Sequence, residues 1–152
     1  MEEFSCNLPT RVIFGLGKLK LLGESTKKLG SKAFLVVDPY LAEIGLCDEI
    51  ISLLKKESIE ITKFNQIHPN PSCFDVDQGA ELVKENKCDV IVGVGGGSTL
   101  DTTKGIAILA RNPGKSWEYV ERTDHKVSRP KEVLPMIAVP ATAGTGSEVT
   151  LY

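Results

Sequence analysis

The sequence predicts an α/β fold in which a Rossmann-like parallel sheet is flanked by helices and preceded by an N-terminal β-hairpin. Two observations carry this prediction. Short apolar runs alternate with helical patterns along the chain, which is typical of βαβ units. The composition, 41% hydrophobic and 25% charged over 152 residues, suits one domain with a sizeable core.

The first part of the chain is predicted to supply the hairpin, a helix and a buried strand. A strand over Arg11–Gly15 pairs in this interpretation with Phe4–Leu8. The stretch "GKLKLLGESTKKLG" indicates a helix that ends at Gly30, because glycine is the preferred residue after a helix. The apolar run Ala33–Val37 predicts a buried strand, which an Asp-Pro pair stops.

A helix, a strand and a second helix are expected next. The helix covers roughly Ala42–Ser58, and the alternating run Ile59–Phe64 predicts the strand. Ser72 is the expected N-cap of the second helix, with Asp75 three residues further on, an arrangement related to the capping box. This helix is expected to end near Asn86.

The last part of the chain continues the same alternation. "DVIVGV" predicts a strand, and Ser98–Arg111 the helix after it, which "NPG" stops. The polar segment 115–132 is expected to be a loop with one turn around Trp117. The final strand is predicted over Leu134–Val139.

Charge and cysteine usage exclude several classes of protein. The net charge of -2 is mixed along the chain, which does not indicate a nucleic-acid partner. No apolar run approaches the roughly 18 residues of a membrane helix. The N-terminus has no apolar signal-peptide core, and the four cysteines form no CxxC pair, so we expect a cytoplasmic protein with reduced thiols. His68 and His125 belong to no metal-ligand motif, and His68 is expected to be a solvated loop residue.

The stretch "GVGGGSTLDTTKG" places Gly95, Gly96 and Gly97 between a strand and a helix that opens at Ser98. Backbone N–H groups meet there beside the positive end of the helix, which favours binding of phosphate or pyrophosphate. The alternative is a tight turn without a ligand. Three glycines exceed what a turn requires, since each loses conformational entropy on ordering. Phosphate binding is therefore the favoured interpretation.

Asp101 and Lys104 follow at helical spacing, and both side chains lean towards the glycine turn. Each also has a structural explanation. Ser98 and Asp101 have the spacing of an N-cap and an acidic N3 residue, and Lys104 is placed to pair with Asp101. Taken as a set with the glycines, they favour the binding interpretation.

Three further strand ends carry polar groups to the same edge of the predicted sheet. Asp38 is placed to accept the hydroxyls of an adenosine ribose and to repel a 2′-phosphate, or else to start the Asp-Pro turn. Asn70 lies between two prolines, where an Asx-type turn is the alternative. In "VPATAGTGSEVT", Thr142 and Thr145 stand among glycines that leave amides accessible to an anion.

With these motifs the chain resembles the iron-containing alcohol dehydrogenases, whose fold is related to that of dehydroquinate synthase. The resemblance rests on "GVGGGSTLDTTKG" and "VPATAGTGSEVT", supported by Asp38, the "PNP" loop and "RVIFG". It covers essentially the whole chain but only the N-terminal half of the family. It implies an NAD(P)-dependent oxidoreductase that interconverts an alcohol and an aldehyde by hydride transfer, and it points to a homodimer.

The resemblance also implies a role for each candidate residue. Asp38 holds the adenosine ribose and favours NAD over NADP. The pyrophosphate is bound by Gly96, Gly97 and Ser98, and it is bordered by Asp101 and Lys104. Thr142 and Thr145 line the cofactor groove, with Asn70 near it. Ala141 departs from the family, which usually has threonine there.

Family members bind Fe²⁺ or Zn²⁺ through an Asp and three His of a helical C-terminal domain, which is absent from residues 1–152. No residue of this chain therefore receives a metal-ligand or catalytic role, and we expect the chain alone to be an NAD(P)-binding domain without activity. Two other interpretations remain: a dehydroquinate synthase-like lyase, against which the "AGTGSEVT" loop argues, and a non-catalytic nucleotide-binding or dimerisation module.

Overall fold

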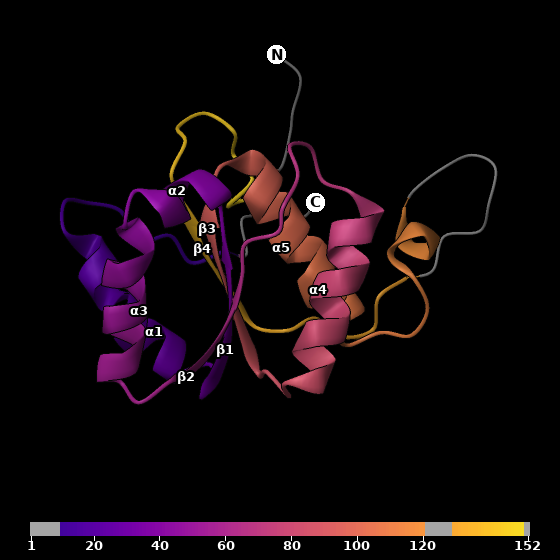
Figure 1. Cartoon of the computed structure of the whole chain (residues 1–152), viewed down its shortest axis with the longest axis horizontal. Helices are drawn as coiled ribbons and strands as arrows, with labels where there is room; N and C mark the ends of the chain where they lie inside the picture. The colour runs from indigo at the N-terminus through magenta and orange to yellow at the C-terminus, as the bar shows by residue number, and fades with distance from the viewer. Residues whose placement is uncertain (1–9, 121–128, 151–152) are drawn as a thin grey trace, which may run out of the picture.

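The computed structural model describes residues 10–120 and 129–150. Its centre is a parallel sheet in the order β2-β1-β3-β4 (Figure 1). The strands are β1 (Lys32–Val37), β2 (Glu60–Phe64), β3 (Val90–Gly95) and β4 (Met136–Pro140). The predicted α/β fold with a parallel sheet flanked by helices is confirmed.

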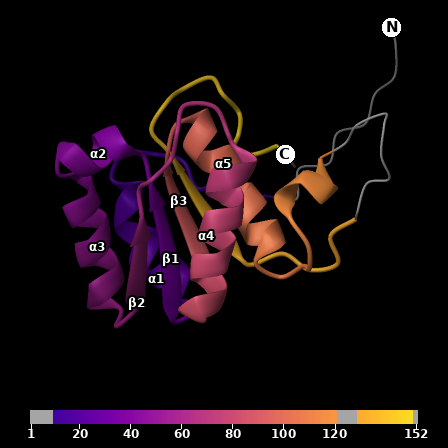
Figure 2. The same cartoon turned by 45° about the vertical axis from the view of Figure 1, so that its right-hand side comes forward.

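Helices cover both faces of the sheet, as Figures 1 and 2 show. One face carries α1 (Leu22–Lys27), α2 (Pro39–Glu43) and α3 (Leu46–Lys56), and the other carries α4 (Cys73–Glu85) and α5 (Gly97–Leu109). Two short 3-10 turns, η1 (Lys18–Leu21) and η2 (Ser116–Tyr119), complete the described elements.

The central strand β1 shows why the chain forms two cores. Successive side chains of a strand point to opposite faces, so Phe34 and Val36 pack under α4 and α5 while Leu35 and Val37 pack under α1 and α3. All four are fully buried. A strand buried on both faces has no polar side, which explains the continuous apolar run in the sequence.

Close packing of α4 against α5 depends on glycine. A Cβ on Gly79 would run into the side chain of Ile106, and a Cβ on Gly105 would lie 2.9 Å from Cγ2 of Val76. Small residues at these two positions let the helices approach and fix the direction of α5. That direction sets where its first residues lie relative to the sheet.

The predicted helix boundaries need three corrections. The helix expected over Ala42–Ser58 is two helices, because Gly45 adopts φ +84° between them. Gly30 is not the cap of the first helix: α1 ends at Lys27 with Lys28 as C-cap, and Gly30 is bare because a Cβ would collide with Asp89. The helix expected from Ser98 begins at Gly97.

The predicted N-terminal hairpin is not seen. Arg11–Phe14 has no strand structure, and the expected partner, residues 4–8, lies outside the described residues. Phe14 is 94% exposed, so no described segment packs over this apolar stretch. The strands expected at 59–64, 89–94 and 134–139 and the capped helix from Ser72 are confirmed with shifts of one or two residues.

No described helix has the length and apolar character needed to cross a bilayer.

Candidate nucleotide-binding site

The carboxyl ends of the strands meet at one edge of the sheet, as their parallel register requires. Two backbone hydrogen bonds fasten the loops there. The N–H of Asp38 donates to the carbonyl of Val94 at 2.9 Å, and the N–H of Ala141 donates to the carbonyl of Gly95 at 2.8 Å. The loops that follow β1 and β4 are thus held on either side of the end of β3. Open α/β sheets bind ligands at such an edge.

Each of the three glycines at the end of β3 leaves room for a different neighbouring side chain. A Cβ on Gly95 would lie 2.6 Å from Oγ1 of Thr99, so this glycine is required by the turn itself. Gly96 takes the N-cap position of α5, where a Cβ would lie 3.1 Å from Oγ1 of Thr142. Gly97 is the first helical residue, and a Cβ there would lie 3.3 Å from Cγ2 of Thr145. The last two glycines therefore let the loop after β4 come close to the start of α5.

The start of α5 has unused hydrogen-bond donors. Gly96 has no side chain to cap the helix, and the N–H groups of Gly97, Ser98 and Thr99 have no hydrogen-bond acceptor in residues 10–120 and 129–150. Ser98 is thus the second helical residue and not the N-cap: the N-cap is Gly96, two residues earlier than the sequence pattern indicates. Such unpaired donors at a helix start attract an anion.

Asp38 has a structural role as well as its place at the edge. It is the N-cap of α2: one carboxylate oxygen accepts from the N–H of Tyr40 at 2.9 Å. The hydroxyl of Thr99 lies 3.4 Å from the other oxygen. The turn-forming alternative is therefore realised, and the same contacts place the carboxylate beside the first turn of α5.

Asn70 joins the site through its backbone. Its φ of +64° lies in the left-handed region, which asparagine tolerates better than most residues. Its N–H lies 3.3 Å from Oγ of Ser98, and Ser98 accepts this hydrogen bond. The loop after β2 is thereby linked to the start of α5.

Asp101 and Lys104 lie one turn further along α5 and pair with each other. Their charged atoms are 2.8 Å apart. The Lys104 ammonium also donates to Oγ1 of Thr150 at 2.9 Å. The alternative that the two residues form an ion pair is therefore seen. The hydrogen bond from Lys104 to Thr150 links α5 to the chain beyond the Thr142–Thr145 loop.

A cavity of about 440 Å³ opens between these loops, in the size range of small-molecule sites. It contains two of the predicted residues, Asp38 and Ser98. Four other predicted residues lie next to Ser98 but do not line this cavity. They approach each other in two pairs, Gly96 with Thr142 and Gly97 with Thr145. Sequence reasoning missed the remaining lining residues: Pro39, Tyr40, Ile67, His68, Pro69 and Thr99. The apolar members of this set suit a flat base, and the polar ones suit hydroxyl groups.

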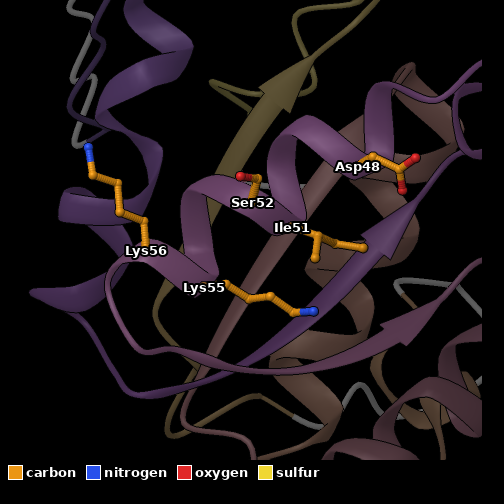
Figure 3. A pocket seen from close by; sticks show the side chains of 5 residues that line it. All are labelled: Asp48, Ile51, Ser52, Lys55 and Lys56. Carbon is orange, nitrogen blue, oxygen red and sulfur yellow. The ribbon is translucent and has the colours of Figure 1, made fainter.

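A second hollow, of about 560 Å³, lies elsewhere and is lined only by α3. Figure 3 shows its five residues along this one helix, with the side chains of Lys55 and Lys56 extended. No loop from a strand end reaches it, and it holds none of the predicted residues. It is therefore not the candidate site.

No three His, Cys, Asp or Glu side chains come together in residues 10–120 and 129–150. The described part of the chain thus offers no set of ligands for iron or zinc, and no residue is assigned to a metal.

The chain is similar to known alcohol dehydrogenases along its whole length. It is 41% identical to a choline dehydrogenase of Bacillus subtilis (strain 168) over 154 residues, which cover 100% of this chain and 38% of that protein. The chain therefore spans well under half of this curated relative.

Solved structures give the same result. An alcohol dehydrogenase from an archaeal halo-thermophile of a Red Sea brine pool superposes with a TM-score of 0.92 at 39% identity, covering 99% of this chain and 39% of that one. A sulfoacetaldehyde reductase from Bifidobacterium kashiwanohense, solved in complex with NAD⁺, has a TM-score of 0.83 at 27% identity, with coverage of 99% and 39%. Residues 9–152 match the sequence profile described as iron-containing alcohol dehydrogenase. The chain belongs to the iron-containing alcohol dehydrogenase family.

Proposed function

We propose that residues 1–152 form the NAD-binding domain of an alcohol dehydrogenase that interconverts an alcohol and an aldehyde. One observation carries the proposal: three N–H groups without acceptors in the described chain stand at the start of α5, where the loops from the strand ends converge. A dinucleotide pyrophosphate is the anion that best matches this place in an α/β sheet. NAD⁺, when bound, supplies the acceptor for the hydride that leaves the alcohol carbon.

The site residues divide this task. The amides of Gly97 and Ser98 bind the pyrophosphate, and Gly96 leaves room for it. Asp38 accepts hydroxyl protons of the adenosine ribose, and its charge disfavours the 2′-phosphate of NADP. Thr142 and Thr145 line the cofactor groove, with Asn70 near it, while Asp101 and Lys104 border the pyrophosphate from the neighbouring turn of α5.

The chemistry on the alcohol belongs to the rest of the protein. We propose that a helical C-terminal domain supplies Fe²⁺ or Zn²⁺ and that the enzyme is a cytoplasmic homodimer. The described residues bring no set of metal ligands together, and their proposed role is to hold the cofactor.

Calorimetric titration of the 152-residue chain with NAD, NADP and ADP tests the proposal. We expect NAD and ADP to bind and NADP to bind more weakly. With Fe²⁺ or Zn²⁺ added, NAD reduction by short alcohols is expected to stay at background. If none of the three nucleotides binds, the chain is an interaction module instead, and metal-dependent turnover would refute the assignment of the chemistry to another domain.

A further inference from the structure

His68 and Asp75 form a pair that the proposed cofactor roles leave unused. Asp75, in the first turn of α4, is fully buried. Its carboxylate accepts from the backbone N–H of His68 at 3.0 Å, and its other oxygen lies 2.9 Å from Nδ1 of the same residue. Two bonds to one carboxylate fix both the backbone and the ring of His68. His68 is a solvent-exposed loop residue, as the sequence predicts, but the bonds to Asp75 restrain it.

The charge of Asp75 decides which ring nitrogen carries the proton. Burial raises the pKa of Asp75, but the hydrogen bonds from the backbone and ring of His68 outweigh it and hold the pKa below its ordinary value. The carboxylate is therefore ionised at neutral pH and can only accept. Nδ1 of His68 must donate to it, so Nε2 of the neutral ring presents a lone pair.

His68 lines the same cavity as Asp38. The titratable groups of that lining are Asp38, the N-cap of α2, Tyr40 in α2, and His68 itself. Helix α5 contributes the uncharged Ser98 and Thr99. A neutral His68 thus adds a second acceptor to a cavity that already holds a carboxylate. Protonation turns the same nitrogen into a cationic donor.

We propose that His68, held by Asp75, is a second determinant of dinucleotide choice: its neutral ring favours the ribose hydroxyls of NAD, and its protonated ring admits the 2′-phosphate of NADP. The inference rests on the proposed function, because it places the adenosine end of the cofactor in this cavity. The side chain of His68 is 69% exposed, so solvent screens its charge. The effect on the affinity ratio is accordingly about fivefold, which corresponds to about 1 kcal/mol.

The test compares NAD and NADP binding by calorimetry at about pH 5.5 and about pH 8, on either side of the range where histidines titrate. At the lower pH the wild-type chain is expected to raise its NADP-to-NAD affinity ratio about fivefold more than the ligand's own titration does. The 2′-phosphate itself titrates near pH 6, which changes the ratio in every variant alike. His68→Gln supplies the matched control, because glutamine offers an acceptor at the place of Nε2 but does not titrate.

We expect His68→Gln and His68→Ala to lose the part of the pH response that exceeds the ligand's own titration. Circular-dichroism melts at both pH values check that the variants fold. An equal pH response in the wild type and both variants overturns the inference, as does an absence of NADP binding to the wild type at both pH values while NAD binds. Failure of NAD to bind at either pH refutes the proposed function itself, so the two failures are distinguishable.

Discussion

Asp38 has both a structural role and a proposed binding role. Its carboxylate caps α2 through the N–H of Tyr40 and also stands next to Thr99 at the start of α5. The sequence offered both interpretations of an aspartate at a strand end, and the geometry makes them compatible. The cap holds the carboxylate in place, and that fixed position is what a ribose requires.

Replacing Asp38 separates the two roles. Asp38→Gly is expected to raise the NADP-to-NAD affinity ratio about tenfold, about 1.4 kcal/mol, because the like charge that faces a 2′-phosphate is removed. Asp38→Asn is the matched control: it keeps an oxygen for the N–H of Tyr40 but loses the charge, so it should change the ratio and spare the melting temperature. An unchanged ratio in both variants, measured by calorimetry, would mean that Asp38 serves only the cap.

Gly97 is where the loop after β4 approaches α5. A valine at this position is expected to weaken NAD binding about tenfold or more, because its side chain enters the space in front of the free N–H groups. It also meets Ser147 and Thr145, since a Cβ would already lie 3.3 Å from Oγ of Ser147 and 3.3 Å from Cγ2 of Thr145. Gly97→Val combined with Ser147→Ala relieves the contact with Ser147 and leaves Thr145, which is proposed to line the groove, unchanged.

The double variant should recover stability in a circular-dichroism melt without recovering NAD affinity. Loss of folding in step with loss of binding, and joint recovery of both, would show that Gly97 is needed for the turn alone.

The sequence places residues correctly where a local motif carries the information, and it fails where folding brings distant residues together. Strand ends, prolines and glycines were enough to place Asp38, Asn70 and Ser98 at the carboxyl edge of the sheet, and their roles in binding stay predictions. The His68–Asp75 pair was missed, because it forms only when the loop after β2 places His68 over the first turn of α4. The capping position of Asp75 was visible in the sequence, but its burial was not.

At the scale of elements, a carboxylate joins the amino ends of two strands. Asp89, just before β3, accepts from the N–H of Lys32 at 2.8 Å, from the N–H of Ser31 at 2.9 Å and from the Ser31 hydroxyl at 3.0 Å. These groups precede or begin β1. The bonds align β1 and β3 at the end of the sheet opposite the site, and thereby set the register that brings Asp38 beside the end of β3.

The acid stability of the chain should depend on Asp89. Burial raises its pKa, but the hydrogen bonds from Lys32 and Ser31 outweigh it and hold the pKa below the ordinary value. A depressed folded pKa stabilises the fold above the unfolded pKa of about 3.9, and the contribution is lost as pH falls through the folded pKa. We expect Asp89→Asn to lower the free energy of unfolding by about 1–3 kcal/mol at neutral pH.

That difference should shrink when denaturant unfolding is repeated at progressively lower pH, below about pH 4. Glu85→Ala, on the exposed side of α4, is the control and should leave the pH profile unchanged. A penalty for Asp89→Asn that stays constant down to the lowest pH would show that packing, and not the charge of Asp89, matters.

The type and order of the helices and strands were predictable because apolar periodicity is a local property of the sequence. The residues at which they begin and end were harder to predict. Gly45 breaks a helix that the apolar pattern alone would continue, since a residue with φ +84° cannot lie inside a right-handed helix. Gly30 resembled a helix cap but is bare because Asp89 lies against it. A glycine required by a distant contact cannot be told from a capping glycine by sequence alone.

At the scale of the whole molecule, the sheet places the proposed binding residues at one edge and the structural carboxylate Asp89 at the other. The chain spans 38% of the curated relative described above, and its described residues contain no group of metal ligands. Cofactor binding by this part of the fold, and action on the alcohol by the rest of the enzyme, stay proposals.

The most direct test is an NMR titration of the isotope-labelled chain with NAD. Binding at the proposed edge predicts that the amide resonances of Gly97, Ser98 and Thr99 shift most, followed by those near Asp38 and Asn70. Residues of the α3 hollow, such as Ser52 and Lys55, should not respond. If no amide at the start of α5 shifts at saturating NAD, or if the α3 residues shift instead, the central claim is wrong.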